Sequence, residues 1–360
     1  MINNLLSRVD WLLVIPAFIL VFLSLITLLS INQSLFWHQL IIALVSFAVF
    51  LFFSSLDVHM LRGYAMPLYI LSFILLLIVL IVGIESRGAV RWIDIFGFRI
   101  QFSEILKPFL IICLASVLSA YQDKSLRTLG LILLLFLPIF FFIYRQPDLG
   151  SALIYLGVVV LTLIVYGFSW IWFVIGAIGF IAMIPVVWQF LHEYQKNRIL
   201  TFLRITHDPA DLSYNAIQAI IAVGSGMIWG KGIGQGTQSA LKFLPERATD
   251  FLFATLSEDL GFIGSSIVIL VFGMLLMRCC MIFTRTDDVF EKMIITASIS
   301  LLFIQGFVNI GMNIGLLPIV GVTLPFVSYG GSSLLSNAII LGLISSISYH
   351  SARKNVMVIG

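Results

Sequence analysis

The sequence predicts an all-α polytopic membrane protein with about ten transmembrane helices and one long extracytoplasmic loop between helices seven and eight. Two observations carry this prediction. Hydrophobic residues make up 61% of the 360 residues and charged residues only 10%, whereas soluble domains average about 25% charged residues. The apolar stretches are also continuous and close to the roughly 20 residues that a spanning helix needs, without the alternating pattern of β-barrel strands.

Ten stretches meet the length requirement for a span. They lie near residues 11–31, 36–55, 66–84, 104–120, 129–145, 150–166, 170–190, 251–277, 293–315 and 329–348. An even number of spans places both termini on the same side of the membrane. No polar stretch is long enough to build a core of its own, so residues 1–360 are expected to form a single transmembrane domain, with residues 191–250 as its long loop.

We expect both termini to be cytoplasmic, which puts nine of the 20 Lys and Arg residues inside and eleven outside. This distribution runs against the usual excess of basic residues inside. The outside residues are confined to 85–107, Arg145 and 191–250, and such a basic layer beside the membrane suits an anionic ligand. Long loops also cross the membrane regardless of charge, so this alternative stays open.

The connection between the third and fourth spans, "SRGAVRWIDIFGFRIQFSEILKP", is the first stretch with candidate chemistry. Arg87, Arg91 and Arg99 flank a tryptophan, a residue that is enriched at membrane interfaces. Glu104 and Lys107 follow three residues apart at the start of the fourth span, which places them on one helix face. The pair fits a role in supporting a substrate, and it equally fits a plain intrahelical ion pair.

The stretch "YRQPDLGSAL" joins the fifth and sixth spans and contains Arg145 and Asp148. Both are candidates for binding or supporting a substrate. Pro followed by Asp and Gly is also an ordinary turn and helix start, because Pro fixes φ and Asp accepts hydrogen bonds from unpaired N–H groups. In that interpretation Arg145 is an anchor at the membrane interface.

Residues 191–250 contain the glycine-rich run "VGSGMIWGKGIGQG", with Lys231 inside it. Closely spaced glycines let the main chain approach a ligand and offer N–H groups to an anion, so Lys231 is a candidate substrate contact. The run is not a Walker A loop, because a serine replaces the first glycine and a glycine follows the lysine. The segment "AIQAIIAVGSGMIW" is too short and glycine-rich to span, and we expect it to lie on the surface or to re-enter the membrane.

The stretch "LPERATDFLFATLSEDL" brings charges to the start of the eighth span, although a charge at the bilayer centre costs roughly 2.5–3.5 kcal/mol. Asp250 stands where the long loop enters the span, with Arg247 nearby, and can meet water at the membrane surface. A helix N-cap is the alternative role for Asp250. Glu258 and Asp259 lie roughly 12–13 Å deeper, which favours a structural or gating role, as a buried ion pair or as the lining of a lipid cavity.

The sequence shows no metal or cofactor motif. Its three cysteines and five histidines are scattered, without the spacing of a protein-made zinc site. We predict no cofactor and no nucleic-acid partner, and a requirement for a divalent metal stays open.

Five motifs, in order along nearly the whole chain, resemble the SEDS family of bacterial cell-wall proteins, the RodA and FtsW group. They are "GAVRWIDIFGFRIQFSE", "QPDLGSAL", "IQAIIAVGSGMIWGKGIGQGTQ", "FLPERATDFLFATLSEDLGFIG" and "NIGMNIGLLPIVGVTLPFVSYGGSS". Two positions depart from the family pattern: Phe102 stands where "QPSE" has Pro, and Ala248 stands where "HTDF" has His. Neither departure removes a charged group, although Ala248 lacks a side chain that hydrogen-bonds near Asp250.

This resemblance implies an inverting peptidoglycan glycosyltransferase of the bacterial cytoplasmic membrane. Such an enzyme polymerises lipid II, a disaccharide-peptide on undecaprenyl diphosphate, on the outer side of that membrane. The resemblance also implies a class B penicillin-binding protein as partner, which supplies the transpeptidase, and Asp250 as the counterpart of the family's essential aspartate. A short N-terminal tail and the form "QPDLG" favour a RodA-like role in elongation and cell shape over a role in division.

The residues fit this chemistry. Glycan extension requires a base for the acceptor hydroxyl as it attacks the anomeric carbon of the donor, and Asp250 is the predicted general base. Because the diphosphate leaves as a stable anion, cations replace the second carboxyl group that glycoside hydrolysis needs. The predicted cation pool is Lys107, Arg91, Arg145, Lys231 and Arg247, and Glu104 and Asp148 are expected to support the base or the donor.

Two other functions stay open. A flippase would carry lipid II across the bilayer, and Glu258 and Asp259 favour it, since transporters place their sites near the midplane of the membrane. Most charges nevertheless gather in one outer layer, and the sequence has no convincing internal repeat. A scaffold without catalysis, which only recruits the penicillin-binding protein, would not need Asp250.

Overall fold

The computed structural model describes residues 8–86, 89–95, 98–121, 123–191, 193–203, 212–241 and 243–359. Arg87, one of the cations considered above, lies outside these residues. Within the described chain, ten helices are long and apolar enough to cross a membrane. They are α2 (Trp11–Ile31), α3 (Gln33–Ser55), α5 (Ala65–Val82), the pair α6 (Phe102–Ile105) and α7 (Lys107–Ala120), α8 (Leu126–Arg145), α9 (Leu149–Tyr166), α10 (Trp170–Phe190), α14 (Leu252–Arg285), α15 (Val289–Asn313) and α16 (Gly331–Ile359).

All ten predicted spans are confirmed, and their ends differ from the prediction by a few residues at most positions. Two helices are longer than predicted: α16 continues to Ile359 instead of ending near residue 348, and α14 continues to Arg285 instead of ending near residue 277. The predicted end of α14 lies one residue before Arg278. The helix passes through this position because the guanidinium of Arg278 donates to both carboxylate oxygens of Asp10, over 3.2 and 2.6 Å.

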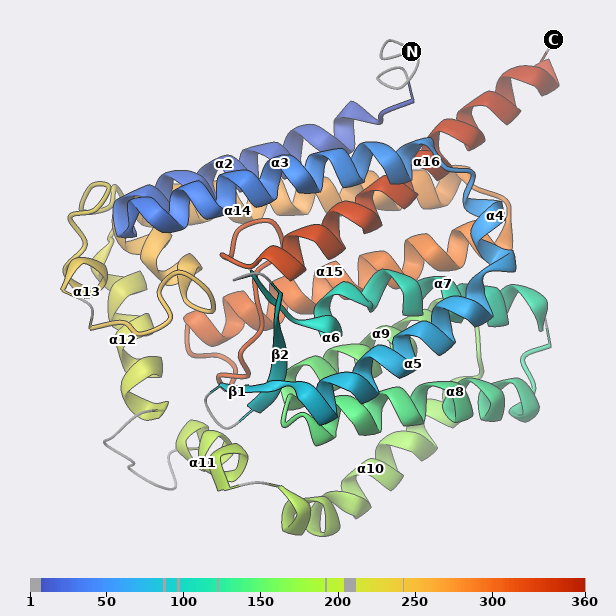
Figure 1. Ribbon diagram of the computed structural model, residues 1–360, viewed down its shortest axis with the longest axis horizontal. Coiled ribbons are helices and arrows are strands. Elements are labelled where there is room, and N and C mark those ends of the chain that lie inside the picture. Colours follow the sequence, from blue (N-terminus) through green and yellow to red (C-terminus); the bar gives the residue numbers. More distant parts are fainter. Residues whose placement is uncertain are drawn as a thin grey trace.

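The start of α2 and the end of α16 lie at one end of the helix bundle (Figure 1). We call the opposite end the loop end; it carries the described residues within 83–101, 146–148, 191–251 and 314–330. Polar residues at the helix starts set the boundaries, because their side chains accept hydrogen bonds from N–H groups of the first turn. These N-caps are Asp10 of α2, Asn32 of α3, Asp57 of α4 (Val58–Gly63), Ser125 of α8, Asp148 of α9 and Asp288 of α15.

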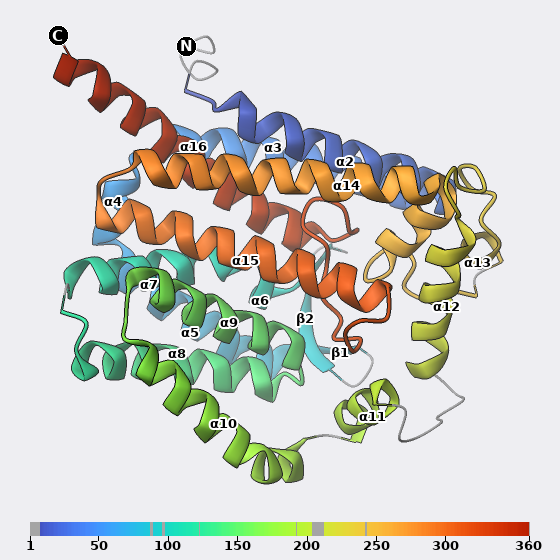
Figure 2. The same ribbon diagram turned by 180° about the vertical axis from the view of Figure 1, so that it is seen from behind.

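The bundle is built around α16, which packs along α3 and also contacts α14 and α15. In the 18-residue apolar window of its spanning part, Gly331–Ser351, 83% of the residues are buried. On the other side α15 packs against α7 and α9, and α14 packs against α2, as the view from behind shows (Figure 2). The outer helices expose large apolar side chains, and none of the 21 residues of α10, all described, is buried. Such faces are stable only against lipid or another apolar partner.

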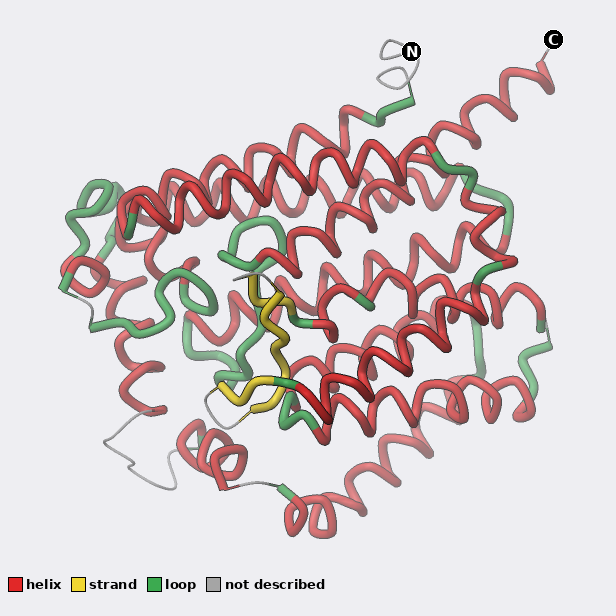
Figure 3. Tube along the Cα trace, viewed as in Figure 1, coloured by secondary structure: helices red, strands yellow, loops and turns green. Residues whose placement is uncertain are grey.

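Two connections at the loop end have structure that the sequence analysis did not predict. Residues 84–100 form a small antiparallel sheet of β1 (Ile84–Ser86), β2 (Ala89–Ile95) and β3 (Phe98–Ile100), in which β2 is central (Figure 3). The long loop contains three helices, α11 (Glu193–Phe202), α12 (Leu212–Ser225) and α13 (Thr237–Ala240). Helix α12 contains most of the segment that was expected to lie on the surface or to re-enter the membrane, and it packs against α14, with Ala219 and Ala222 buried.

Helix α14 is interrupted one-third of the way along its length. Gly261 has φ 68° and ψ −162°, outside the helical region, in a conformation that only glycine adopts readily. The main chain of residues 226–230 lies directly against this kink: N–H groups of Phe262 and Ile263 donate to the carbonyls of Met227 and Ile228, over 2.8 and 3.2 Å. The long loop is therefore anchored to the first third of α14.

Candidate active site

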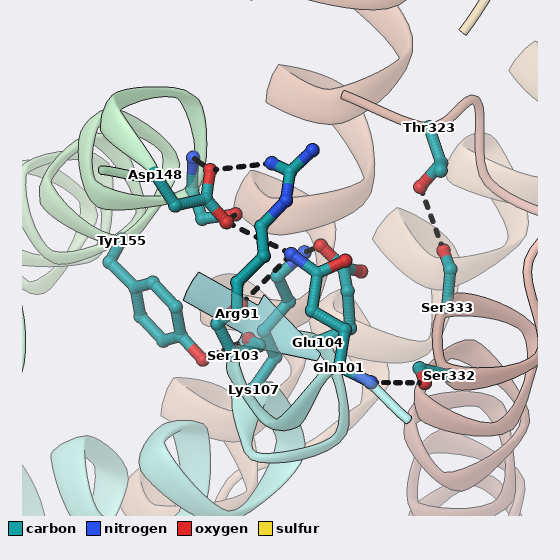
Figure 4. A network of polar contacts seen from close by, with 11 residues as sticks. Arg91, Gln101, Ser103, Glu104, Lys107, Asp148, Tyr155, Thr323, Ser332 and Ser333 are labelled. Atoms are coloured by element: carbon teal, nitrogen blue, oxygen red, sulfur yellow. Dashed lines mark hydrogen bonds and ion pairs between the residues drawn. The ribbon is translucent and has the colours of Figure 1, made fainter. Parts of the chain in front are cut away.

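Asp148 is the centre of a buried polar cluster formed by β2, α6 and the start of α9 (Figure 4). Its side chain caps α9 by accepting the N–H of Ser151 at 3.1 Å, so the predicted helix start is confirmed. The same carboxylate also accepts the hydroxyl of Ser151 at 2.8 Å and the amide of Gln101 at 2.9 Å, and it lies 3.6 Å from the guanidinium of Arg91. A helix cap needs none of these further contacts, so Asp148 does more than start a helix.

Glu104 and Lys107 form the predicted ion pair at the start of the fourth span. Both residues are buried, with 7% and 2% of their surface exposed. The neighbouring Ser103 is tied to α9, because the hydroxyl of Tyr155 donates to its carbonyl at 2.7 Å. Two charges out of water are stable only when they stay paired, and removing one partner of such a pair typically costs about 3–5 kcal/mol.

The loop between α15 and α16, residues 314–330, joins this cluster to the rest of the loop end. The N–H of Gln101 donates to Ser332 at the start of α16 (2.9 Å), and Thr323 in the loop shares a hydrogen bond with Ser333 (2.9 Å). Gly150 in the first turn of α9 lies against the main chain of Val320, where a Cβ would stand 2.4 Å from the carbonyl oxygen. The close approach of α9 to this loop therefore requires glycine at position 150.

Asp250 lies on the other side of the same loop, partly buried, just before α14. The N-cap position of α14 is Phe251, and it makes no side-chain hydrogen bond; the alternative that Asp250 serves as an N-cap is therefore wrong. Its main-chain carbonyl instead accepts hydrogen bonds from Asn309 and Asn313, each at 3.0 Å. Its carboxylate faces Gly321, since a Cβ on that glycine would stand 3.5 Å from Oδ2.

The remaining cations differ in their partners. Arg247 is partly buried, and burial lowers the pKa of its guanidinium below the ordinary value, although an arginine remains charged at neutral pH. Neither Arg247 nor the exposed Arg145, at the end of α8, pairs with a carboxylate within the described ranges. Among the described residues, no carboxylate therefore competes with an anionic ligand for these two cations.

The glycine-rich segment, residues 224–236, binds the chain's own carboxylates. The ammonium of Lys231 pairs with Glu258 at 3.0 Å, and the N–H groups of Gln238 and Ser239 donate to the same carboxylate at 3.0 and 3.1 Å. The hydroxyl of Ser239 adds a contact at 2.9 Å. Glu258 is completely buried. Lys231, a predicted substrate contact, and the N–H groups that follow the segment thus contact a carboxylate of the chain itself.

Asp259 fixes the same segment to α2. Its Oδ2 atom accepts the hydroxyl of Ser30 and the N–H of Gly234, both at 3.2 Å, and its carbonyl accepts the N–H of Gly232 at 3.0 Å. Gly230, Gly232 and Gly234 all have positive φ, which explains why this turn around α14 is rich in glycine. These contacts support a structural role for both deeper carboxylates.

No group of three or more His, Cys, Asp or Glu side chains that could hold a metal ion occurs among the described residues. The sequence analysis missed several polar residues that organise the loop end: Gln101, Ser103, Tyr155, Asn309, Asn313 and Ser332. The one signal available was "NIGMN", which places two asparagines four residues apart, on one helix face.

Known proteins match this chain along most of its length. A model of the FtsW/RodA/SpoVE family, described as "Cell cycle protein", matches residues 3–353. The chain belongs to this family. Among other FtsW/RodA/SpoVE proteins, the peptidoglycan glycosyltransferase MrdB of Escherichia coli (strain K12) is 40% identical over 295 residues, which cover 81% of this chain and 79% of MrdB. Stage V sporulation protein E of Bacillus subtilis (strain 168) is 36% identical over 324 residues, 87% of each chain.

Solved structures of the FtsW/RodA/SpoVE type share the fold. A chain of a peptidoglycan synthase complex, studied for the structural coordination of polymerization and crosslinking, has a TM-score of 0.83 at 29% identity and covers 95% of this chain and 98% of its own length. The rod shape determining protein RodA of Thermus thermophilus has a TM-score of 0.72 at 26% identity, with 94% and 96% covered. The ten-span arrangement is therefore that of the family.

Proposed function

We propose that this protein is a peptidoglycan glycosyltransferase that polymerises lipid II at its loop end, with Asp250 as the general base. Its relatives named peptidoglycan glycosyltransferases support the reaction class. One observation carries the choice of site. Asp250 is a partly buried residue at the loop end, on main chain that two buried amides hold in place, three residues from Arg247, a cation that pairs with no carboxylate of the described residues.

The reaction joins two lipid-linked sugars. The acceptor hydroxyl oxygen attacks the anomeric carbon of the donor from the face opposite the diphosphate, and the carbon–oxygen bond to the diphosphate breaks. The diphosphate leaves with the bonding electron pair, and Asp250 takes the proton of the acceptor hydroxyl. One base suffices because the leaving group is already a stable anion, whose developing charge is stabilised by cations.

The contacts divide the predicted cation pool into two groups. Lys107, Arg91 and Lys231 each lie against a carboxylate of the chain, in Glu104, Asp148 and Glu258. We assign these three cations to supporting roles. Arg247 and Arg145 have no such partner among the described residues, and we assign the diphosphate to them. Arg247 is the principal contact, because it is partly buried and so less screened by water.

The Asp148 cluster and the Glu104–Lys107 pair hold the segments around this site in place. They fix the start of α7, the start of α9 and the loop of residues 314–330 relative to one another. That loop also faces the carboxylate of Asp250. These fixed segments serve catalysis because a reacting group must be held within a fraction of an ångström of its productive position.

The loop end faces the outer side of the bacterial cytoplasmic membrane in this proposal, and both termini are cytoplasmic. The position of the start of α2 and the end of α16 at one end supports it (Figure 1), and so does the donor, whose sugars are assembled into wall outside that membrane. A class B penicillin-binding protein is the proposed partner for crosslinking. The similarity to a chain of a peptidoglycan synthase complex supports this partner.

A flippase is the second candidate, and it loses its main support. Glu258 and Asp259 favoured a transporter as charges within the membrane. Glu258, however, is neutralised by Lys231 and accepts several further hydrogen bonds, and Asp259 anchors the glycine-rich segment to α2. Carboxylates used in this way connect parts of the fold.

Reconstitution of the purified protein with lipid II tests the proposal. We expect glycan chains in liposomes that contain the protein together with a class B penicillin-binding protein, and none with the Asp250→Asn variant. Movement of lipid II between leaflets without chain formation would support the flippase instead. If the protein produces neither glycan chains nor movement between leaflets, a scaffold is the remaining function.

A further inference from the structure

Two buried asparagines in the last turn of α15 bind the main chain around Asp250. Asn309 and Asn313 are four residues apart and therefore share a helix face, and neither has any exposed surface. A polar side chain inside a membrane-spanning helix is stable only when its hydrogen bonds are satisfied. The contacts of these two side chains show what they satisfy.

Asn309 connects two separate segments. Its amide nitrogen donates to the carbonyl of Asp250 at 3.0 Å and to the carbonyl of Val322, in the loop between α15 and α16, at 2.7 Å. An amide nitrogen carries two hydrogens, so both donors of Asn309 are used. One side chain thereby sets the distance between the start of α14 and that loop.

Asn313 fixes the orientation of the same main chain. Its amide nitrogen also donates to the carbonyl of Asp250, at 3.0 Å, and to the carbonyl of Asn309, at 2.8 Å. Its oxygen accepts the N–H of Ala254 at 3.1 Å. Asp250 is thus held before the helix and Ala254 within its first turn, so the direction in which α14 begins is determined by one side chain.

We propose that Asn309 and Asn313 are positioning residues, which hold the carboxylate of Asp250 in its reactive place beside Gly321. The proposal rests on the function proposed for Asp250. The carboxylate faces Gly321, one residue before Val322, so the two carbonyls bound by Asn309 belong to the two segments that flank the reacting group. Without the amides, the hydrogen bonds that join the start of α14 to the loop of residues 314–330 are lost, and the carboxylate can shift. A displacement of about 1 Å can lower a reaction rate about 100-fold.

The test replaces each asparagine with leucine, which has a similar volume and no donor. We expect Asn309→Leu and Asn313→Leu to lower kcat for lipid II polymerisation about 10- to 100-fold, with KM within about threefold of the unmodified protein. The matched control is Asn337→Leu on α16: Asn337 is also buried, and its amide nitrogen has no hydrogen-bond partner in the described chain. We expect that control to retain its kcat. If the leucine variants do not fold, Asn309→Asp removes both donors at nearly constant volume.

A double-variant cycle with Asp250→Asn separates positioning from general support of the fold. If the asparagines act through Asp250, Asn309→Leu lowers the residual rate of Asp250→Asn no further. A full additional loss in the double variant, or an equal loss in Asn337→Leu, would overturn the positioning role. Retention of kcat in Asn309→Leu and Asn313→Leu would overturn it too and leave Asp250 as the base. An active Asp250→Asn would overturn the proposed base and the positioning role together.

Discussion

Replacing Asp250 with Asn removes the proposed base and leaves the local main chain intact. The hydrogen bonds that Asn309 and Asn313 donate to this residue end on its carbonyl oxygen, which the substitution does not change. The N-cap position of α14 is Phe251, so the substitution also leaves that position unchanged. We therefore expect the free energy of unfolding to change by no more than about 1 kcal/mol. A neutral amide cannot accept the proton, and general-base catalysis contributes about 10²–10⁴-fold, which corresponds to about 2.7–5.4 kcal/mol of activation free energy.

The assay follows glycan chains made from lipid II by the purified variant with its penicillin-binding partner, together with thermal unfolding in the same detergent. We expect at most about one-hundredth of the unmodified rate, an unchanged unfolding midpoint and normal copurification of the partner. A polymerisation rate near that of the unmodified protein would refute the assignment and turn attention to Asp148 and Glu104. A variant that loses activity and also unfolds early would contradict the claim that the fold does not depend on this carboxylate.

The other predictions concern cations and topology. Lys107→Ala should destabilise the protein by about 3–5 kcal/mol and weaken polymerisation. The control is Lys196→Ala, in an ion pair of the same spacing whose glutamate is 84% exposed, and it should cost about 0–1 kcal/mol. Equal effects of the two substitutions on thermal unfolding and activity would contradict this prediction. Arg247→Gln should raise KM for lipid II at least about tenfold, since a hydrogen bond to a charged group contributes about 1.5–3 kcal/mol; an unchanged KM would exclude it from the diphosphate. Lys231→Met should lower the unfolding midpoint, and also changing its partner glutamate to Gln should restore part of the loss; absence of restoration would show that the pair does not stabilise the fold. A cysteine at Leu241, which is exposed, should react with an impermeant reagent from the outer side, and labelling only from the cytoplasm would reverse the proposed orientation.

The spans were predictable because the bilayer imposes one length and one composition on every crossing helix. The prediction was weakest where a charge interrupts that pattern. The predicted span ended one residue before Arg278, although the ion pair of Arg278 with Asp10 keeps it inside the helix. A hydropathy profile does not show such a partner, because the partner lies 268 positions away in the sequence.

Only the charged residues of the candidate site could be predicted from the sequence. Glu104 and Lys107 are three residues apart, so their contact follows from helix geometry. Asp148 was recognised as a helix start, but its contacts with Arg91 and Gln101 bring together different segments of the chain. Beyond the spacing of Asn309 and Asn313, uncharged polar residues carry no sign of their role in sequence, because their partners are main-chain carbonyls that every residue possesses.

The glycine-rich segment shows how a correct physical rule can be applied to the wrong partner. Close approach of main chain and exposed N–H groups were both expected there. Both occur, but the approaching surface is the kink of α14, and the anions are Glu258 and Asp259. A sequence shows that a segment can bind an anion, and it does not show whether the chain itself supplies one.

The ion pair between Lys231 and Glu258 has a consequence for biogenesis. The ribosome makes the lysine 27 residues before the glutamate, so the counter-ion has already emerged when α14 reaches the translocon. A lone carboxylate in an inserting helix costs roughly 2.5–3.5 kcal/mol, and the earlier segment lowers this barrier by entering with the helix as one unit. We expect a nascent chain truncated to begin after residue 236 to insert α14 less efficiently than one that begins at residue 212, which glycosylation mapping of the inserted fraction can measure.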